Sequence, residues 1–203
     1  MQLTLRGVSH RFTDAAWLFR NLTFRFEAGT SYALTGPSGS GKSTLLALAA
    51  GWITPAEGNV ESRGIDRTSW VFQNSHGMPR RTALDHVVLP MIAGGLTRAE
   101  SESIAHGTLA RFRLGGLASR PFRALSGGEA QRLMFARAVA ANPQLILVDE
   151  PTAQLDAVTS KLVNSVIQEL SDDGRILLVA SHDADTVASC DVRLDLAAYA
   201  AED

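Results

Sequence analysis

Gly36-Pro37-Ser38-Gly39-Ser40-Gly41-Lys42-Ser43-Thr44 is the stretch that decides the fold of this chain. It has the pattern of a phosphate-binding loop, in which glycines let the backbone curl so that successive N–H groups point at a polyphosphate. An apolar run at 32–34 precedes it, and a helix-forming run at 42–50 follows it. This order predicts a nucleotide site beside the positive end of a helix dipole, and not a simple Gly/Ser-rich turn. Lys42 would reach the β- and γ-phosphates of ATP, and the Ser43 hydroxyl would bind Mg²⁺.

The composition is that of an ordinary globular chain. With 203 residues, 45% of them hydrophobic and 20% charged, the chain can form one large domain or a domain with a subdomain. A net charge of -2 gives no electrostatic footprint for nucleic acid. The single cysteine, Cys190, excludes an internal disulfide. Because no apolar signal segment and no apolar run of about 18 residues occurs, we expect neither a signal peptide nor a membrane span.

Two segments near the N-terminus are predicted to be strands, because apolar side chains alternate over 3–8 and over 22–26. Phe12 follows the first of them and could stack on a nucleobase, with Trp17 as the rival and ordinary packing as the alternative. Gln73 follows a short apolar strand at 70–72, at the strand end where α/β sheets bind ligands. Its amide oxygen could bind Mg²⁺, although taken alone it is more simply a surface polar residue.

A helical segment is expected from about 80 to 123. Thr82 and Thr97 are each followed three residues later by an acidic residue, which is the pattern of a capping box. Pro90 and Gly94-Gly95 are expected to interrupt the helices. With the helix that follows, this segment would form an insertion between two strands of the sheet, over about 80–140.

Ser126-Gly127-Gly128-Glu129 begins the next helix, which is predicted to run to 141. Ser126 would cap this helix, and the glycines would expose backbone N–H groups beside it, as in a second phosphate-binding device. A chain usually needs one such device for each nucleotide. The residues alone therefore favour an ordinary Ser-capped helix.

Polar side chains end two later strands. Four apolar residues at 145–148 predict a buried parallel strand that ends in Asp149-Glu150. Two carboxylates there cost desolvation energy unless a cation or a reacting water uses them. Asp149 suits a place in the second coordination shell of Mg²⁺, and Glu150 suits activation of the attacking water. His182, just after another buried strand at 176–180, could reach a γ-phosphate from the same edge.

In this order, the motifs resemble those of the nucleotide-binding subunit of ATP-binding-cassette (ABC) transporters, and the resemblance covers essentially the whole chain. It changes the interpretation of 126–129, because it implies that this segment contacts the ATP held by a second copy of the chain. It also implies that Glu150 is the catalytic carboxylate, that His182 is the switch histidine and that the Gln73 loop senses a membrane partner. Asp156 would belong to a dimer-interface loop. Phe12 stands where the family usually has an adenine-stacking Tyr.

Within the family, 84–90 and 149–156 are similar to the lipoprotein-release and macrolide-export type. The resemblance implies an α/β fold: a P-loop NTPase core with a mainly parallel sheet, an inserted helical subdomain and a small antiparallel β-subdomain. Only 31 positions separate Lys42 from Gln73, so the β-subdomain is expected to be shortened. We treat 1–203 as a single ABC ATPase domain.

The expected function is ATP binding and hydrolysis by a head-to-tail dimer of two chains, with ATP and Mg²⁺ as ligands. The dimer would drive a separate membrane permease, of the FtsX or MacB-like type, from the cytoplasmic face of the membrane. The alternative is a soluble regulatory or repair ABC ATPase without a membrane partner. Such proteins usually carry a long coiled-coil insertion or two cassettes in one chain, and neither is visible in this sequence.

Overall fold

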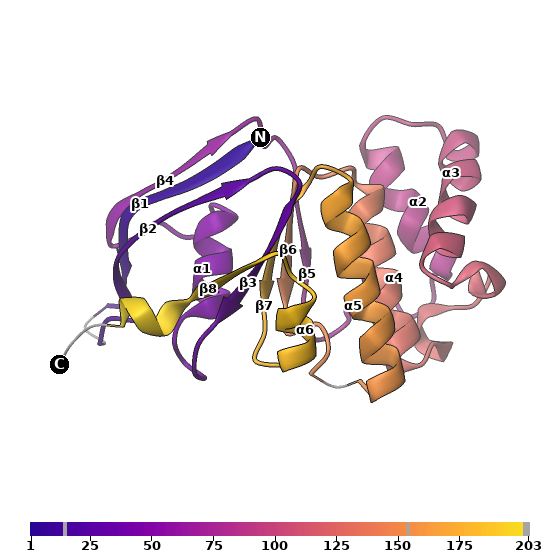
Figure 1. Ribbon diagram of the computed structural model, residues 1–203. Helices are drawn as coiled ribbons and strands as arrows, with labels where there is room; N and C mark the ends of the chain where they lie inside the picture. Colours follow the sequence, from indigo (N-terminus) through magenta and orange to yellow (C-terminus); the bar gives the residue numbers. More distant parts are fainter. Residues whose placement is uncertain (14–15, 154, 201–203) are drawn as a thin grey trace.

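The computed structural model describes residues 1–13, 16–153 and 155–200. It contains one parallel sheet, one antiparallel sheet and helices on both faces of the parallel sheet (Figure 1). Gln154 belongs to a segment that carries the family resemblance, and 201–203 belong to the Ala-rich tail. These residues lie outside the described part of the chain.

The parallel sheet has five strands. Their order across the sheet is β5 (Thr68–Val71), β6 (Leu145–Asp149), β7 (Ile176–Ala180), β3 (Thr30–Thr35) and β8 (Val192–Asp195). All four neighbouring pairs are parallel, so the carboxyl ends of all five strands point the same way. This arrangement brings the strand ahead of the phosphate loop next to the strand that precedes His182.

Apolar runs form the central strands because both faces of the sheet are covered. Along β6, Ile146 and Val148 enter one core, whereas Leu145 and Leu147 enter the other. Side chains of a strand alternate between its faces, so a strand between two cores must be apolar at every position. Asp149, the last residue of β6, is the first that leaves this double burial.

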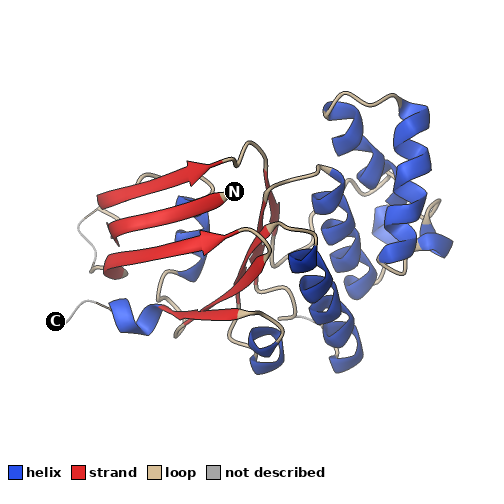
Figure 2. Cartoon of the chain, turned by 45° about the horizontal axis from the view of Figure 1, so that its top comes forward, coloured by secondary structure: helices blue, strands red, loops and turns tan. Residues whose placement is uncertain are grey.

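A small antiparallel sheet covers one side of the molecule. Its order is β2 (Phe19–Glu27), β1 (Gln2–His10) and β4 (Glu57–Arg63). Helix α1 (Lys42–Ala49) lies between this sheet and the parallel sheet, as Figures 1 and 2 show. Leu45, Leu46 and Leu48 of α1 share a core with the apolar side chains of both sheets. The predicted α/β fold with a small antiparallel sheet is confirmed.

The other face of the parallel sheet is covered by helices. Along the chain, five elements separate β5 from β6: α2 (Ala83–Ala93), α3 (Arg98–Arg111), the 3₁₀ turns η1 (Gly115–Leu117) and η2 (Phe122–Ala124), and α4 (Gly127–Ala140). Helix α5 (Ala157–Asp172) and the short α6 (Ala184–Ala188) follow later in the chain, whereas η3 (Leu196–Tyr199) packs in the core that the two sheets share. Capping boxes begin α2 and α3, at Thr82 and Thr97, as the sequence predicts. The predicted cap of α4 at Ser126 is also present, as a third capping box.

Pro90 does not interrupt the helical segment, so that expectation is wrong. It lies inside α2, which continues to Ala93 and ends at Gly94. A proline there removes one backbone donor, since its ring nitrogen carries no hydrogen. The buried face of α2, which includes Val87, Val88 and Met91, packs against the core and holds the helix in place despite that loss.

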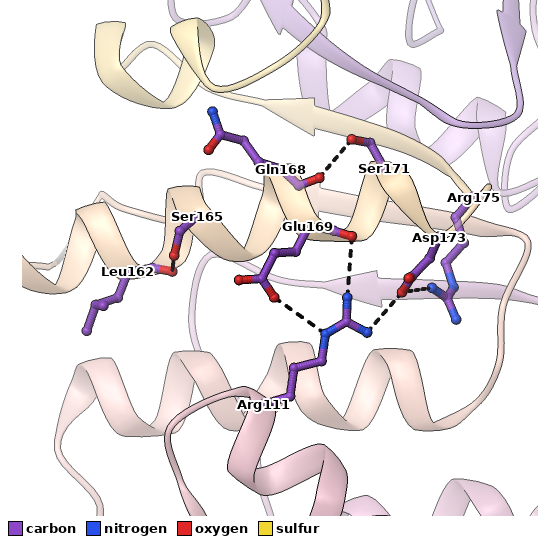
Figure 3. Close-up of polar contacts among 8 residues, drawn as sticks. All are labelled: Arg111, Leu162, Ser165, Gln168, Glu169, Ser171, Asp173 and Arg175. Atoms are coloured by element: carbon purple, nitrogen blue, oxygen red, sulfur yellow. Dashed lines mark hydrogen bonds and ion pairs between the residues drawn. The ribbon is translucent and has the colours of Figure 1, made fainter.

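An ionic cluster joins α3 to the end of α5 (Figure 3). The Arg111 guanidinium lies 2.9 Å from an Asp173 carboxylate oxygen and 3.5 Å from a Glu169 carboxylate oxygen. Arg175 also pairs with Asp173. Hydrogen bonds from the two arginines hold the pKa of Asp173 below its ordinary value, although burial opposes this shift. The cluster fixes the inserted helices against the sheet-bearing core.

Candidate functional site

The phosphate loop connects β3 to α1, and its glycines have conformations that other residues rarely adopt. Gly36, Gly39 and Gly41 have φ values of 141°, 83° and 90°. A Cβ on Gly41 would lie 2.9 Å from the Phe19 ring, so this position also needs the missing side chain. Gly41 supplies no side-chain cap to α1, and no acidic residue stands in the first turn. The helix therefore presents its positive end without an internal anion.

Lys42 lies against the loop itself. Its ammonium group donates hydrogen bonds to the carbonyl oxygens of Gly36, at 3.0 Å, and Pro37, at 3.2 Å. This contact keeps the positive charge over the loop, where an incoming polyphosphate would meet it.

Asp149 and Glu150 occupy different environments at the end of β6. Burial raises the pKa of the Asp149 carboxyl, and the charge of Glu150 adds to this shift, whereas a hydrogen bond from Ser43 and the charge of Lys42 oppose it. Glu150 has a φ of 44°, which is uncommon for a residue with a Cβ. Its N–H donates to the carbonyl of Ala180 on β7, at 2.9 Å. That bond ties the end of β6 to the strand that leads to His182.

His182 and Glu150 form a direct contact. The His182 Nδ1 atom lies 2.9 Å from a Glu150 carboxylate oxygen. The His182 side chain is 71% exposed, whereas the Glu150 side chain is 14% exposed. The pair therefore joins a largely buried carboxylate to a ring that solvent or a ligand can reach.

One pocket of about 780 Å³ brings these groups together. Eight residues of the phosphate loop and the start of α1 line it, together with Gln73, Glu150 and His182. Phe12 and Leu18, from the connection between β1 and β2, complete the lining. Residues from five parts of the sequence thus meet in one concave site, at the edge of the parallel sheet where α/β proteins bind ligands.

The structure distinguishes the two aromatic candidates for base stacking. Phe12 lines the pocket, is 55% exposed and meets the buried His10 ring edge-on, with 5.0 Å between the ring centroids. Trp17 is not among the described residues that line the pocket. Its ring is flanked by the guanidinium groups of Arg11 and Arg20, at 4.6 and 5.0 Å. The geometry therefore favours Phe12.

The Ser126 segment lies outside this pocket. Ser126 and Glu129 form the reciprocal hydrogen bonds of the capping box, and these bonds lower the pKa of the Glu129 carboxyl. A Cβ added to Gly127 would meet nothing within 4 Å, whereas one on Gly128 would lie 2.3 Å from the Thr159 methyl group. Gly127 thus leaves the start of α4 open, and Gly128 permits close packing of α4 on α5.

The segment after Gln73 is attached to α4. The Ser75 hydroxyl donates to the side-chain oxygen of the buried Gln131, at 2.5 Å. The Gln131 amide in turn donates to the carbonyl of Phe72, at 3.4 Å. These two hydrogen bonds would therefore transmit a movement of the Gln73 loop to α4, the helix that Ser126 caps.

The oxygen donors of the site suit a hard cation. The Ser43 hydroxyl, the Gln73 amide oxygen and the Asp149 carboxylate are the ligand types that Mg²⁺ prefers, and Mg²⁺ usually takes few protein ligands beside phosphates. Within the described residues, no group of three or more His, Cys, Asp and Glu side chains could hold a metal ion. This donor set fits a cation that arrives with a nucleotide.

Sequence reasoning missed three features of the site region. It did not find α6, which is only five residues long and is capped by Asp183. It did not find the bond between the buried hydroxyls of Thr152 and Thr186. It also did not find the bond in which the Nε2 atom of His86 accepts the backbone N–H of Met78. The bond between Thr152 and Thr186 joins residues that are far apart in the sequence, and no local pattern encodes it.

Comparisons with known proteins agree with the geometry. Residues 19–153 match the family model for ABC transporters. The lipoprotein-releasing system ATP-binding protein LolD of Cereibacter sphaeroides is 38% identical, over 88% of this chain and 88% of its own. The macrolide export ATP-binding/permease protein MacB of Rhodopirellula baltica is also 38% identical, over 86% of this chain but only 28% of its own.

A solved structure shares the fold closely. The dimeric ATP-binding cassette MJ0796, in a post-hydrolysis state bound to ADP and phosphate, superposes with a TM-score of 0.83 and 29% identity. The match covers 95% of this chain and 93% of the other.

Among the described residues, no helix is both long and apolar enough to cross a membrane.

Proposed function

Since this chain belongs to the ABC transporter family and is an ATP-binding subunit that hydrolyses ATP, we propose that its 780 Å³ pocket is the hydrolytic site. The observation that carries the proposal is the contact between Glu150 and His182, which line the same pocket as the phosphate loop. We treat residues 1–203 as one ATPase domain with a helical subdomain at about 80–140.

The phosphate loop binds the nucleotide in this proposal. Backbone N–H groups of 38–44 donate hydrogen bonds to the phosphates. The Lys42 ammonium group gives up its hydrogen bonds to the carbonyls of Gly36 and Pro37 and donates to phosphate oxygens instead. Phe12 stacks on the adenine. Mg²⁺, held through Ser43 and Gln73 and from its second coordination shell by Asp149, would neutralise charge that develops on the phosphates.

Glu150 and His182 act on the attacking water and the γ-phosphate. The Glu150 carboxylate accepts a hydrogen bond from the water and orients it for attack. His182 holds that carboxylate through Nδ1, and its exposed ring can also meet the γ-phosphate. The water is thereby placed between the phosphate and its base.

A second copy of the chain completes the site. Ser126, Gly127, Gly128 and Glu129 are not among the described residues that line the pocket of their own chain, although they cap an open helix start. A head-to-tail pair would bring this segment of each copy to the ATP of the other. The relative MJ0796 is described as dimeric, which supports this arrangement.

The partner of the dimer is a membrane permease, and the chain works at the cytoplasmic face of the membrane. The relative LolD is named as the ATP-binding protein of a lipoprotein-releasing system, and MacB as an ATP-binding/permease protein. We place the permease in a separate chain of the FtsX or MacB-like type, since the relative LolD is named as the ATP-binding protein of its system and the match covers 88% of it.

A groove of about 350 Å³ is the docking surface that we propose for this permease. It lies at the free edge of β5. Its lining comes from β5 and the loop after it, from α2, and from α4 with the residue that ends it: Ser69, Trp70, Phe72, Asn74, His76, Pro90, Met134, Arg137, Ala138 and Ala141. The rings of Trp52, Trp70 and Phe72 are stacked beside it, at centroid distances of 4.5 and 5.2 Å. Trp52 and Phe72 are exposed, which gives a partner helix an apolar platform.

Site variants test the hydrolytic proposal. We expect Glu150→Gln to keep its ATP dissociation constant within about twofold and to lose about 100-fold or more in turnover, because the water loses its base. Lys42→Ala should weaken ATP binding as well. Binding is measured by titration with a fluorescent ATP analogue, and turnover by phosphate release.

Glu57→Gln is the matched control, since Glu57 is an exposed carboxylate on β4 that does not line the pocket. It should behave as the wild type in both assays. Near-normal hydrolysis by Glu150→Gln would remove Glu150 from its role and with it the proposed mechanism.

A further inference from the structure

A buried network of hydrogen bonds lies behind the Glu150–His182 pair. The hydroxyl oxygens of Thr152 and Thr186 are 3.0 Å apart, and both residues are buried. The Thr186 oxygen also lies 3.0 Å from the side-chain oxygen of Asn164, on α5, and 2.7 Å from a carboxylate oxygen of Asp183. We propose that this network sets the position of Glu150 against His182, with Thr186 as its central positioning residue. The inference rests on the hydrolytic role proposed above.

The direction of the hydrogen bonds follows from the number of protons. A hydroxyl group donates one hydrogen bond and accepts up to two. The oxygens of Asp183 and Asn164 only accept, so they take the single Thr186 proton. The Thr152 hydroxyl must then donate to Thr186. The network thus runs from Thr152 through Thr186 to Asp183, and removal of any hydroxyl leaves a buried polar atom without its partner.

The two ends of this chain of bonds stand next to the proposed catalytic groups. Thr152 lies in the turn that Glu150 opens, in which the Ala153 N–H points to the Glu150 carbonyl at 3.4 Å. Asp183 directly follows His182 and caps α6 through the Thr186 N–H, at 2.9 Å. The bond between Thr152 and Thr186 therefore joins the segment after the carboxylate to the segment after the histidine.

The backbone conformation of Glu150 needs contacts that hold it, and the bond between Thr152 and Thr186 is one of them. A φ of 44° is disfavoured for a residue with a Cβ, and such a conformation persists only where surrounding contacts hold it. The N–H of Glu150 is held by Ala180, and Thr152 holds the other side of the turn. Without the Thr152 contact, the carboxylate can rotate away from the water that it must orient. Because Thr186 is buried and does not line the pocket, it acts only through these groups.

The test removes single hydroxyls without changing side-chain volume. Thr152→Val and Thr186→Val are compared with Thr186→Ser, which keeps the hydroxyl. We expect each valine variant to lose about tenfold or more in kcat, since a small misplacement of reacting groups has effects of this size, while the KM for ATP stays within about twofold. Thr186→Ser should stay within about twofold of the wild type in kcat. Turnover is expressed per ATP-binding site, so that loss of folded protein does not imitate the effect.

The double variant Thr152→Val, Thr186→Val should be no slower than Thr186→Val alone, because both changes break the same bond. Ser171→Ala is the control, since Ser171 is a buried hydroxyl on the same helix as Asn164 whose partner is the Gln168 carbonyl (Figure 3). It should leave kcat unchanged. If Thr186→Val does not fold, Thr152→Val carries the test alone, since it leaves the Asp183 cap intact.

Three results would overturn the inference: a normal kcat in Thr152→Val, a serine variant as slow as the valine variant, or additive losses in the double variant. Glu150→Gln is assayed alongside. If Glu150→Gln is inactive while Thr152→Val is normal, only the positioning role fails. If Glu150→Gln hydrolyses ATP normally, the proposed catalytic role fails and takes this inference with it.

Discussion

Phe12 and Trp17 stand five positions apart, and only one of them can offer its face to a base in the pocket. Phe12 lines the pocket, whereas guanidinium groups flank Trp17. We expect Phe12→Ala to weaken ATP binding by about 1 kcal/mol or more, which is the usual contribution of one base–aromatic stack. Trp17→Ala should leave the affinity near that of the wild type. Titration of both variants with ATP measures the difference, and a larger loss for Trp17→Ala would reverse the assignment.

The buried His86 is expected to make the stability of the fold depend on pH. Its Nε2 accepts the Met78 N–H at 2.9 Å, so Nδ1 carries the proton and points to the Thr82 carbonyl at 2.7 Å. Burial lowers the pKa of His86, and the charge of Arg137 adds to this shift, while the Thr82 bond and Asp85 oppose it. The folded state therefore favours the neutral ring. Its contribution to stability is complete above about pH 6.5 and is lost as the pH falls below that value.

His86→Gln tests this dependence. The glutamine oxygen can still accept from Met78, but it does not titrate in this range. We expect the wild-type melting temperature to fall more than that of the variant between about pH 7.5 and 5.5. His10, whose pKa is also lowered by burial, is present in both proteins, so its effect cancels in the comparison. Equal losses in both proteins would show that His86 has no part in the dependence.

At the scale of elements, the loop between β5 and α2 connects the pocket to the proposed docking groove. Gln73 lines the pocket, and Met78 is 43% exposed farther along the same loop. We expect Met78→Asp to leave the ATPase rate of the isolated chain unchanged, because the Met78 contact with His86 is made by the backbone. In the assembled complex, the new carboxylate would be buried against the permease. This burial should cause dissociation of the complex or loss of the stimulation by the permease.

Ile104→Asp is the matched control for this experiment. Ile104 is an exposed apolar residue on α3 and lies outside the loop between β5 and α2 that carries Met78. Co-purification with the permease and ATPase rates with and without it are the measurements. A complex of Met78→Asp that stays assembled and fully stimulated would place the docking surface elsewhere.

The elements that sequence analysis predicted are those with strong local signals. The caps at Thr82 and Thr97 satisfy N–H groups a few residues away, so their pattern is complete within the segment itself. Pro90 misled the prediction because its effect depends on whether tertiary packing holds α2, and that packing is not visible locally. Helix α6 was missed because five residues contain too little periodicity.

In the site, too, the local signals could be predicted from the sequence and the tertiary contacts could not. Strand ends located Gln73, Glu150 and His182 on one edge of the sheet, since that edge follows from parallel topology alone. The stack of Trp52 on Trp70 and the bond between Thr152 and Thr186 could not be predicted. Each joins residues whose proximity exists only after the strands have been ordered.

At the scale of the whole molecule, the pocket of one copy should meet Ser126 of the other. With cysteines at Ser38 and Ser126 in the Glu150→Gln background, we expect ATP to produce a crosslink between chains. Cys190 should not interfere, because burial raises the pKa of its thiol to about 11 and keeps it protonated. Gel electrophoresis of a mixture of tagged and untagged chains separates crosslinks between copies from those within one copy.

A pair at Ser38 and Ser103 is the control, since Ser103 is exposed on α3 and outside the pocket. This pair should not crosslink in response to ATP. Crosslinking of Ser38 and Ser126 only within one chain would refute the head-to-tail arrangement.

The place of β3 in the sheet has a consequence for the synthesis of the protein. Strand β3, at Thr30–Thr35, is synthesised well before both of its neighbours, β7 and β8, which come from 176–180 and 192–195. While the residues between them, 36–175, are added, at about 5–20 residues per second, this apolar strand has no partner in the sheet. Such long-range pairing also slows folding, because a large loop must close first. The nascent chain must therefore protect an unpaired, aggregation-prone strand until 176–195 have been synthesised, and a chain that stops before that point would lack both neighbours of the strand that leads into the phosphate loop.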